Sequence, residues 1–144
     1  MIYLILILSF WLDHVFLNFI SNNSILFPLF TLMSIIIVYS FFKRHKYSNY
    51  LIMCAGLGVL YDVVYSNTLF LNLGLFMLMG ILVKLFFKSF AFNLINCVVV
   101  GFSLICFYRL LSYMMLVLSG YLHWSFSLLL KGIFSSLIAN IYYI

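Results

Sequence analysis

Acidic residues are almost missing from this chain, whose 144 residues include only two, Asp13 and Asp62. Charged residues of both signs make up 6%, whereas an ordinary soluble domain has about 25%. A soluble fold of 16.8 kDa could not cover its surface with so few charges, which excludes a globular cytosolic enzyme. The hydrophobic content of 68% excludes intrinsic disorder, so the composition indicates an integral membrane protein.

Residue patterns that carry chemistry are also scarce. The three cysteines lie in apolar runs without Cys-x-x-Cys spacing, and we expect them to be buried small hydrophobic residues. The three histidines show no metal-ligand spacing. There is no Gly-x-Ser-x-Gly elbow, no His-Glu-x-x-His and no carboxylate pair for phosphoryl or glycosyl transfer. We therefore predict no catalytic residue, no metal site and no cofactor.

Long apolar stretches predict an all-α integral membrane protein, a bundle of about six transmembrane helices in a single domain, 1–144. A span takes about 20 residues, so six leave no room for a soluble domain. The expected helices cover 2–20, 25–42 (with Pro28 in the first turn), 50–65, 69–87, 90 or 92 to 118, and 124–144. The fifth is long for one straight span, and we expect a break around Arg109 to Tyr113.

The basic residues indicate orientation rather than nucleic-acid binding. They are few, although the net charge is +5, and most lie in two patches, 43–46 and Lys84 with Lys88. Such patches at helix ends contact anionic lipid headgroups and remain in the cytoplasm. With six helices both patches fall on one side, so we expect both termini to be cytoplasmic.

Four charged residues fall inside hydrophobic segments, where each charge costs about 2.5–3.5 kcal/mol on insertion scales. They are Asp13, Asp62, Arg109 and Lys131. The structural interpretation is ion pairing or a hydrogen-bonded carboxyl group, and the functional alternative is a proton relay or a substrate site. Matching depths favour the pairs Asp13–Lys131 and Asp62–Arg109. Alternatively, the two cations extend to the headgroups or serve a partner helix.

Small and polar residues mark helix faces expected to lie inside the bundle. Membrane helices approach closely where such residues line up at spacings of four. On the first helix these residues are Ser9, Asp13, His14 and Asn18, and on the last they form two adjacent rows, Ser127, Lys131, Ser135, Ala139 and Gly132, Ser136, Asn140.

The end of the third helix forms an expected elbow with the fourth. Gly58 and Asp62 lie one turn apart on the same face. The glycine lets another backbone approach, and the carboxylate is expected to accept hydrogen bonds from the turn at 66–68. We expect Asp62→Ala and Gly58→Leu to be severe and Gly58→Ala to be mild.

The segment that contains this elbow, 56–72 (GLGVLYDVVYSNTLFLN), resembles the MreD family of rod shape-determining membrane proteins. That family has a Gly-Leu-x-x-Asp type segment at the same place, and the Tyr-Asp-x-x-Tyr-x-Asn-Thr-Leu-Phe-Leu-Asn form resembles Gram-positive members. Length and hydropathy match along the whole chain. Many members have glycine after the turn at the position of Phe70, and Gly74 follows four residues later.

The resemblance implies a bacterial cytoplasmic membrane protein with no catalytic activity. MreD proteins work in the elongation machinery with MreC, actin-like MreB, a SEDS-class glycosyltransferase and its transpeptidase, and a homodimer is possible. Their helices are arranged similarly to the S component of energy-coupling-factor transporters. The residues that we expect to serve structure or partner binding are Gly58, Asp62, Asn67, Asn72, Asp13, Lys131 and Arg109.

The resemblance thus implies a non-enzymatic membrane scaffold that binds MreC and helps control cell shape through sidewall peptidoglycan synthesis, and two other functions are alternatives to it. A vitamin-binding S component needs a cavity lined by convergent polar groups, for which the candidates are Asp62, Asn67, Asn72, His123 and Lys131. A holin-like pore former predicts fewer helices and no acidic and basic residues inside the membrane. A neighbouring MreC gene would favour the scaffold, and neighbouring transporter ATPase genes would favour the S component.

Overall fold

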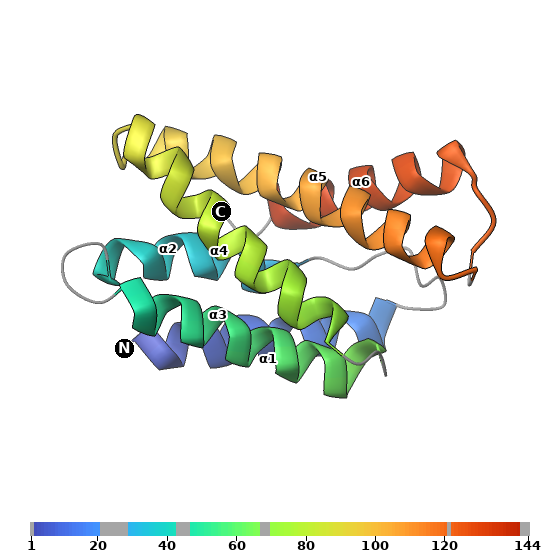
Figure 1. Cartoon of the computed structure of the whole chain (residues 1–144), viewed down its shortest axis with the longest axis horizontal. Helices are drawn as coiled ribbons and strands as arrows, with labels where there is room; N and C mark the ends of the chain where they lie inside the picture. Colours follow the sequence, from blue (N-terminus) through green and yellow to red (C-terminus); the bar gives the residue numbers. More distant parts are fainter. Residues whose placement is uncertain (1, 21–28, 43–46, 67–69, 121, 142–144) are drawn as a thin grey trace. The chain divides into compact units, whose positions relative to one another are not determined.

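The computed structural model describes all residues except 1, 21–28, 43–46, 67–69, 121 and 142–144 (Figure 1). This described part is all-helical, which confirms the predicted all-α class. Its helices are α1 (Ile2–Ile20), α2 (Phe30–Phe42), α3 (Tyr47–Tyr61), α4 (Leu71–Ser89), α5 (Leu94–Leu118) and α6 (Phe126–Ile141). A π-helical segment, η1 (Asp62–Ser66), continues α3.

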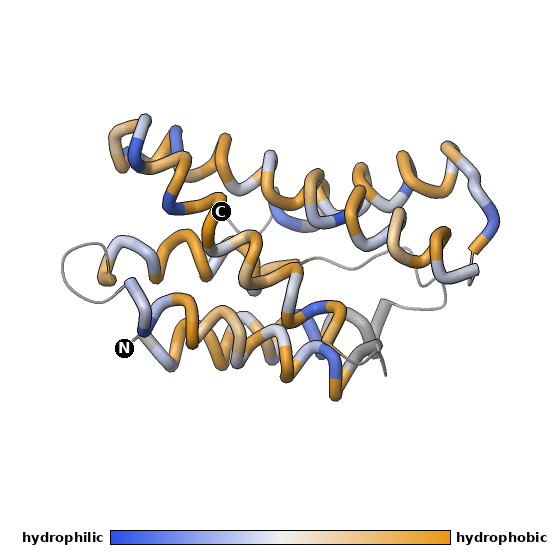
Figure 2. Tube along the Cα trace, viewed as in Figure 1, coloured by the Kyte–Doolittle hydropathy of each residue, from blue (hydrophilic) through white to orange (hydrophobic). Residues whose placement is uncertain are grey.

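Among the described residues, three helical stretches are long and apolar enough to cross a membrane, namely Tyr47–Val64, Leu71–Ser89 and Leu94–Leu118. Three shorter apolar stretches, Tyr3–Val15, Phe30–Phe42 and Phe126–Ile138, lie in the remaining helices. Figure 2 shows that hydrophobic positions dominate the helices. This composition supports the transmembrane character that the sequence predicts.

Helix α5 runs without a break through Arg109 and Tyr113, so the break expected there is wrong. Between Phe102 and Leu118 the sequence has no glycine or proline to interrupt the helical hydrogen bonds. At 1.5 Å per residue its 25 residues extend about 37 Å, which a tilted helix accommodates in a bilayer. Helix α2 starts at Phe30, and Pro28 lies outside the described residues.

The chain divides into two compact units, of which one comprises 35–100. In this unit α3 and α4 run antiparallel, side by side (Figure 1). A methyl group at Gly80 of α4 would lie 3.0 Å from Cys54 Sγ of α3, so the two helices pack closely there. Tyr39 of α2 contacts both helices, since its ring lies 5.3 Å from that of Tyr50 and 5.9 Å from that of Phe87.

The other unit comprises 1–34 and 101–144. Its α1 packs against the start of α2, where Ser9 Oγ donates a hydrogen bond to Ser34 Oγ at 3.0 Å. In this unit the part of α5 from Gly101 onward runs antiparallel to α6, and Arg109 of α5 is hydrogen-bonded to Ser136 of α6 (Figure 1). The Tyr113 hydroxyl of α5 accepts a 2.6 Å hydrogen bond from the Ser125 N–H, which fixes the connection before α6.

Candidate functional site

Asp13 of α1 caps the first turn of α2. Its Oδ1 accepts a hydrogen bond from the Phe30 N–H at 2.8 Å, and its Oδ2 accepts one from the Thr31 N–H at 3.0 Å. The Thr31 hydroxyl donates a further bond to Oδ2 at 2.5 Å. Asp13 is fully buried, and the residue before the helix, Leu29, has a left-handed φ of 58°. The carboxylate therefore satisfies donors that the helix start leaves open.

Asp62 does the same for α4. Its Oδ1 accepts hydrogen bonds from the Asn72 N–H at 2.9 Å and the Asn72 side-chain amide at 3.1 Å. Its Oδ2 accepts one from the Leu73 N–H at 3.0 Å. These donors belong to the first turn of the next helix, while most of the turn at 66–68, where we expected donors, lies outside the described residues. Asn72 belongs to this elbow, whereas Asn67 lies outside the described residues.

The π-helical segment η1 begins at Asp62, where α3 ends. A π turn is wider than an α turn and often marks a functional position in a membrane or soluble helix. Here it coincides with the residue whose carboxylate crosses to α4. The residue before α4, Phe70, has a left-handed φ of 65° and 68% of its surface exposed.

The cap that Asp13 of α1 makes on α2 and the cap that Asp62 makes on α4 are built alike, and we call each junction an elbow. In each, a buried aspartate holds two backbone N–H groups and one side-chain donor at the start of the next helix. In each, a non-glycine residue with left-handed φ comes directly before that helix, and the side-chain donor (Thr31 or Asn72) stands two positions later. The chain between the partners differs, because Phe30 lies 17 residues after Asp13 and Asn72 lies 10 after Asp62.

This geometry favours the structural interpretation of both aspartates. A carboxylate is stabilised at a helix N-terminus by the N–H groups and the macrodipole. Inside a bilayer no water can satisfy those N–H groups, so each would otherwise cost several kcal/mol. Asp13 and Asp62 each supply the missing acceptors.

Gly58 is the point of closest approach between α3 and α4. A methyl group there would lie 2.5 Å from Leu73 Cα, 2.7 Å from Asn72 O and 2.8 Å from Leu73 N. The predicted backbone approach is confirmed. The expectation that Gly58→Ala is mild is wrong, because all three atoms belong to the backbone and cannot turn away as a side chain can.

Arg109 and Lys131 lie in the α5–α6 pair, in different surroundings. Arg109 Nε donates a 2.7 Å hydrogen bond to Ser136 Oγ. Ser136 and Asn140 of α6 are fully buried, so of the two predicted rows this one faces inward, whereas Lys131 is exposed.

Of the two expected ion pairs, the structure bears on Asp13–Lys131 only. Within the described residues Asp13 is buried against the start of α2 and Lys131 is exposed, so the expected pair between them is not formed. Asp62 and Arg109 belong to different units, and their pairing stays a prediction. His14, expected on the inward face of α1, is exposed instead, while Ser9 on that face is buried.

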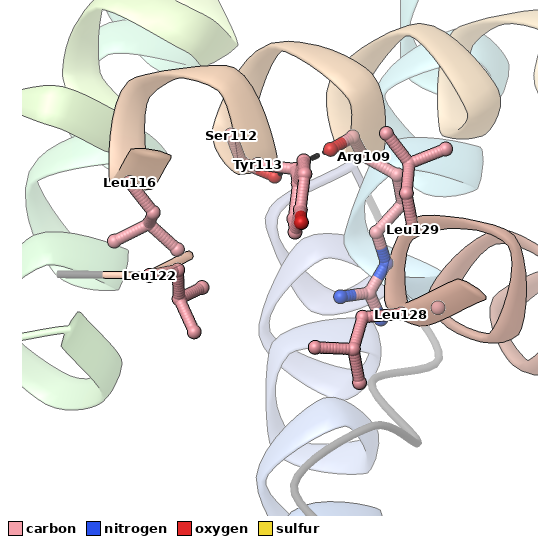
Figure 3. Close-up of a pocket in the computed structure, with 8 residues that line it drawn as sticks. Arg109, Ser112, Tyr113, Leu116, Leu122, Leu128 and Leu129 are labelled. Carbon is pink, nitrogen blue, oxygen red and sulfur yellow. Dashed lines mark hydrogen bonds between the residues drawn. The ribbon is translucent and has the colours of Figure 1, made fainter. Parts of the chain in front are cut away.

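An open cavity of about 240 Å³ lies between α5 and α6 (Figure 3). It is lined by Arg109, Ser112, Tyr113, Leu116, Leu122, Leu128, Leu129 and Gly132. Of the polar residues that we expected to line a ligand cavity, Asn67 lies outside the described residues and the other four are not among those that line this one. The sequence identified Arg109 as a charged residue inside an apolar segment. It gave no sign of the role of Tyr113, whose hydroxyl accepts a hydrogen bond from the Ser125 N–H in the α5–α6 connection.

No protein-family model, curated protein or solved structure matches this chain. The described part of the chain is apolar and helical, with three stretches suited to crossing a membrane and with two carboxylates that cap helices.

Proposed function

We propose that the chain is an MreD-like membrane scaffold of the bacterial elongation complex. In this proposal it has no catalytic activity, binds MreC and supports cell-shape control and sidewall peptidoglycan synthesis. The SEDS-class glycosyltransferase and its transpeptidase are further candidate partners. The chain lies in the cytoplasmic membrane, crosses it several times and keeps both termini in the cytoplasm.

The observation that carries this proposal is the backbone at Phe70. Phe70 stands where many MreD members have glycine, and its φ of 65° is a conformation that glycine adopts without strain. Three residues of the segment that resembles the family, Gly58, Asp62 and Asn72, also contact or face one another in this elbow. These contacts give a physical explanation for finding these residue types together in the segment.

A scaffold is also consistent with how the charged groups are used. Both carboxylates bind helix starts, which is a structural task. Many large apolar side chains are exposed on the helices, among them Trp11, Ile52 and Phe134. These faces suit lipid and the apolar helices of membrane partners.

The S-component alternative is less well supported. Sites for small molecules of drug size usually enclose about 300–1,000 Å³ and present several convergent polar groups. The α5–α6 cavity has about 240 Å³ and four leucines among its eight lining residues. A vitamin would fit this space poorly, so the cavity favours a smaller group.

Depletion of the protein in its own host tests the proposal. Depleted cells should become wider and rounder, and sidewall incorporation of a fluorescent D-amino acid should fall. The wild-type gene should restore both, whereas Asp62→Ala should fail and Gly56→Ala, at a glycine with open space around it, should succeed. Unchanged shape and unchanged sidewall labelling after depletion would contradict the proposal.

A further inference from the structure

Two exposed lysines lie on one face of α4, close to the end of the helix. Lys84 and Lys88 fall in its last two turns, and the helix ends at Ser89. A spacing of four places their side chains on the same side of the helix, where two like charges repel each other. An anion that contacts both ammonium groups would remove this repulsion.

The start of α3 holds one of these two cations. Lys84 Nζ lies 3.7 Å from the centroid of the Tyr47 ring. This tyrosine is the first residue of α3, and α3 and α4 run antiparallel, so the contact joins the start of one helix to the end of the other (Figure 1). The face of an aromatic ring attracts an ammonium group without neutralising its charge. Lys84 is therefore held in position and still needs a counterion.

The unit that comprises 35–100 contributes no acidic side chain at this end. Its sequence contains one acidic residue, Asp62, which follows directly after the 15 residues of α3. At 1.5 Å per residue, Asp62 lies about 22 Å along the helix from Tyr47. Its carboxylate binds the start of α4, whereas Lys84 and Lys88 lie at the end of that helix. The charge at the end of α4 is thus complementary to an anion from outside this unit.

With α3 and α4 across a bilayer, this end of the helix pair lies at one of the bilayer surfaces. Both stretches, Tyr47–Val64 and Leu71–Ser89, are long and apolar enough to cross. The rings of Tyr47 and Tyr50 lie 6.1 Å apart at the same end, and tyrosine is enriched at the level of the lipid headgroups. The two lysines therefore lie at the depth of the lipid phosphates.

The exposed side chains of α4 follow the order of the groups in a phospholipid. Leu78 and Ile81, which are 39% and 43% exposed, come before Lys84 and so lie deeper in the bilayer. The lysines follow, toward the surface. A glycerophospholipid has its acyl chains inside and its phosphate at the surface, so it matches both parts of this face. Inorganic phosphate matches the cations alone.

We infer that the end of α4 binds an anionic glycerophospholipid, with the lipid phosphate between Lys84 and Lys88. Tyr47 positions Lys84, and the acyl chains contact Leu78 and Ile81. A headgroup with net negative charge, such as that of phosphatidylglycerol, suits this site better than phosphatidylcholine, whose own cation neutralises its phosphate. The inference shares with the proposed function only the crossing of the membrane by α3 and α4.

A competition between two lipids tests the inference. The full-length protein in mild detergent is mixed with equal amounts of phosphatidylglycerol and phosphatidylcholine that have identical acyl chains. Native mass spectrometry then counts which lipid each protein molecule retains. We expect the wild type to retain phosphatidylglycerol about ten times as often, a preference that corresponds to about 1.4 kcal/mol. Equal retention of the two lipids overturns the inference.

Single substitutions separate a defined site from a general attraction of anionic lipid to a basic protein. Lys84→Gln and Lys88→Gln should each lower the preference about threefold, since each removes one of two cations that share the phosphate. Lys131→Gln is the matched control, because it removes the same charge from an exposed position on α6. An equal fall in all three variants overturns the inference in favour of a general attraction. If a variant does not fold, the two lipids still decide the question on the wild type.

A salt comparison distinguishes the lipid from inorganic phosphate. Sodium phosphate and sodium chloride at equal ionic strength should displace phosphatidylglycerol to the same extent, because the acyl chains contribute to its binding. Stronger displacement by sodium phosphate overturns the inference in favour of a site for the free ion.

The inference and the proposed function can fail separately. If the wild type prefers phosphatidylglycerol and both lysine variants lose that preference, the inference stands, even where depleted cells keep their shape and the proposed function fails. If depleted cells become round but the wild type retains both lipids equally, the proposed function stands and the inference fails.

Discussion

Replacing Gly58 by alanine is the sharpest test of how α3 and α4 pack. The added methyl group would lie 2.5 Å from Leu73 Cα and 2.7 Å from Asn72 O, about 1 Å closer than ordinary van der Waals contact near 3.5–4.0 Å. Relief requires α4 to move away, because the obstructing atoms are backbone. That movement also lengthens the bonds from Asp62 to Asn72 and Leu73. Overpacking costs about 1–3 kcal/mol, and the strained cap places Gly58→Ala at the upper end.

Unfolding by sodium dodecyl sulfate in mixed micelles, followed by circular dichroism, measures this loss. Gly56→Ala is the matched control, since it makes the same change two residues earlier on the same helix with open space around the new methyl group. We expect it to be neutral or to stabilise the helix by up to about 1 kcal/mol. Equal unfolding midpoints for Gly58→Ala and the wild type would refute the close approach of the two helices.

Four further predictions follow from the same geometry. Asp13→Ala and Asp62→Ala should each lower the unfolding free energy in micelles by about 3 kcal/mol, because each leaves two backbone donors unsatisfied. If only one of the two variants lost stability, the equivalence of the elbows would be contradicted. Phe70→Gly should raise the free energy of unfolding by up to about 1 kcal/mol, since it relieves a left-handed φ at an exposed side chain. Phe90→Gly, at an extended φ of −114°, should not raise it, and equal effects of the two changes would argue against the strain. Tyr113→Phe should cost about 1–2 kcal/mol through loss of the acceptor for the Ser125 N–H, and an unchanged thermal midpoint in detergent would show that the bond is absent. Fluorescent and enzymatic tags should report both termini in the cytoplasm, and a C-terminal tag outside would remove the six-helix topology.

Local chemistry explains why much of the fold could be predicted from the sequence. Apolar runs of sufficient length specify helices almost regardless of context, so α1 and α4 lie close to their expected ranges. Gly58 was identifiable because a glycine one turn before an intramembrane aspartate indicates close packing. The severity of Gly58→Ala was not, since it depends on distances of tenths of an ångström to Leu73.

The partners of the aspartates were harder to predict. Depth along a helix suggested that Asp13 would pair with Lys131, yet depth does not say which groups face each other. The first turn of a helix supplies backbone donors that no sequence pattern displays, and those of α2 bind Asp13. The likeness of the two elbows was hidden for the same reason, because it lies in backbone conformation at Leu29 and Phe70, with connections of different length.

Co-purification with the MreC encoded by the same genome tests the central claim most directly. Both proteins are co-expressed, the chain is captured through an affinity tag in mild detergent, and the eluate is separated by size-exclusion chromatography. The account predicts that MreC elutes with the chain in one peak in constant proportion. A folded chain that elutes apart from MreC, at a protein concentration where both are abundant, would contradict it.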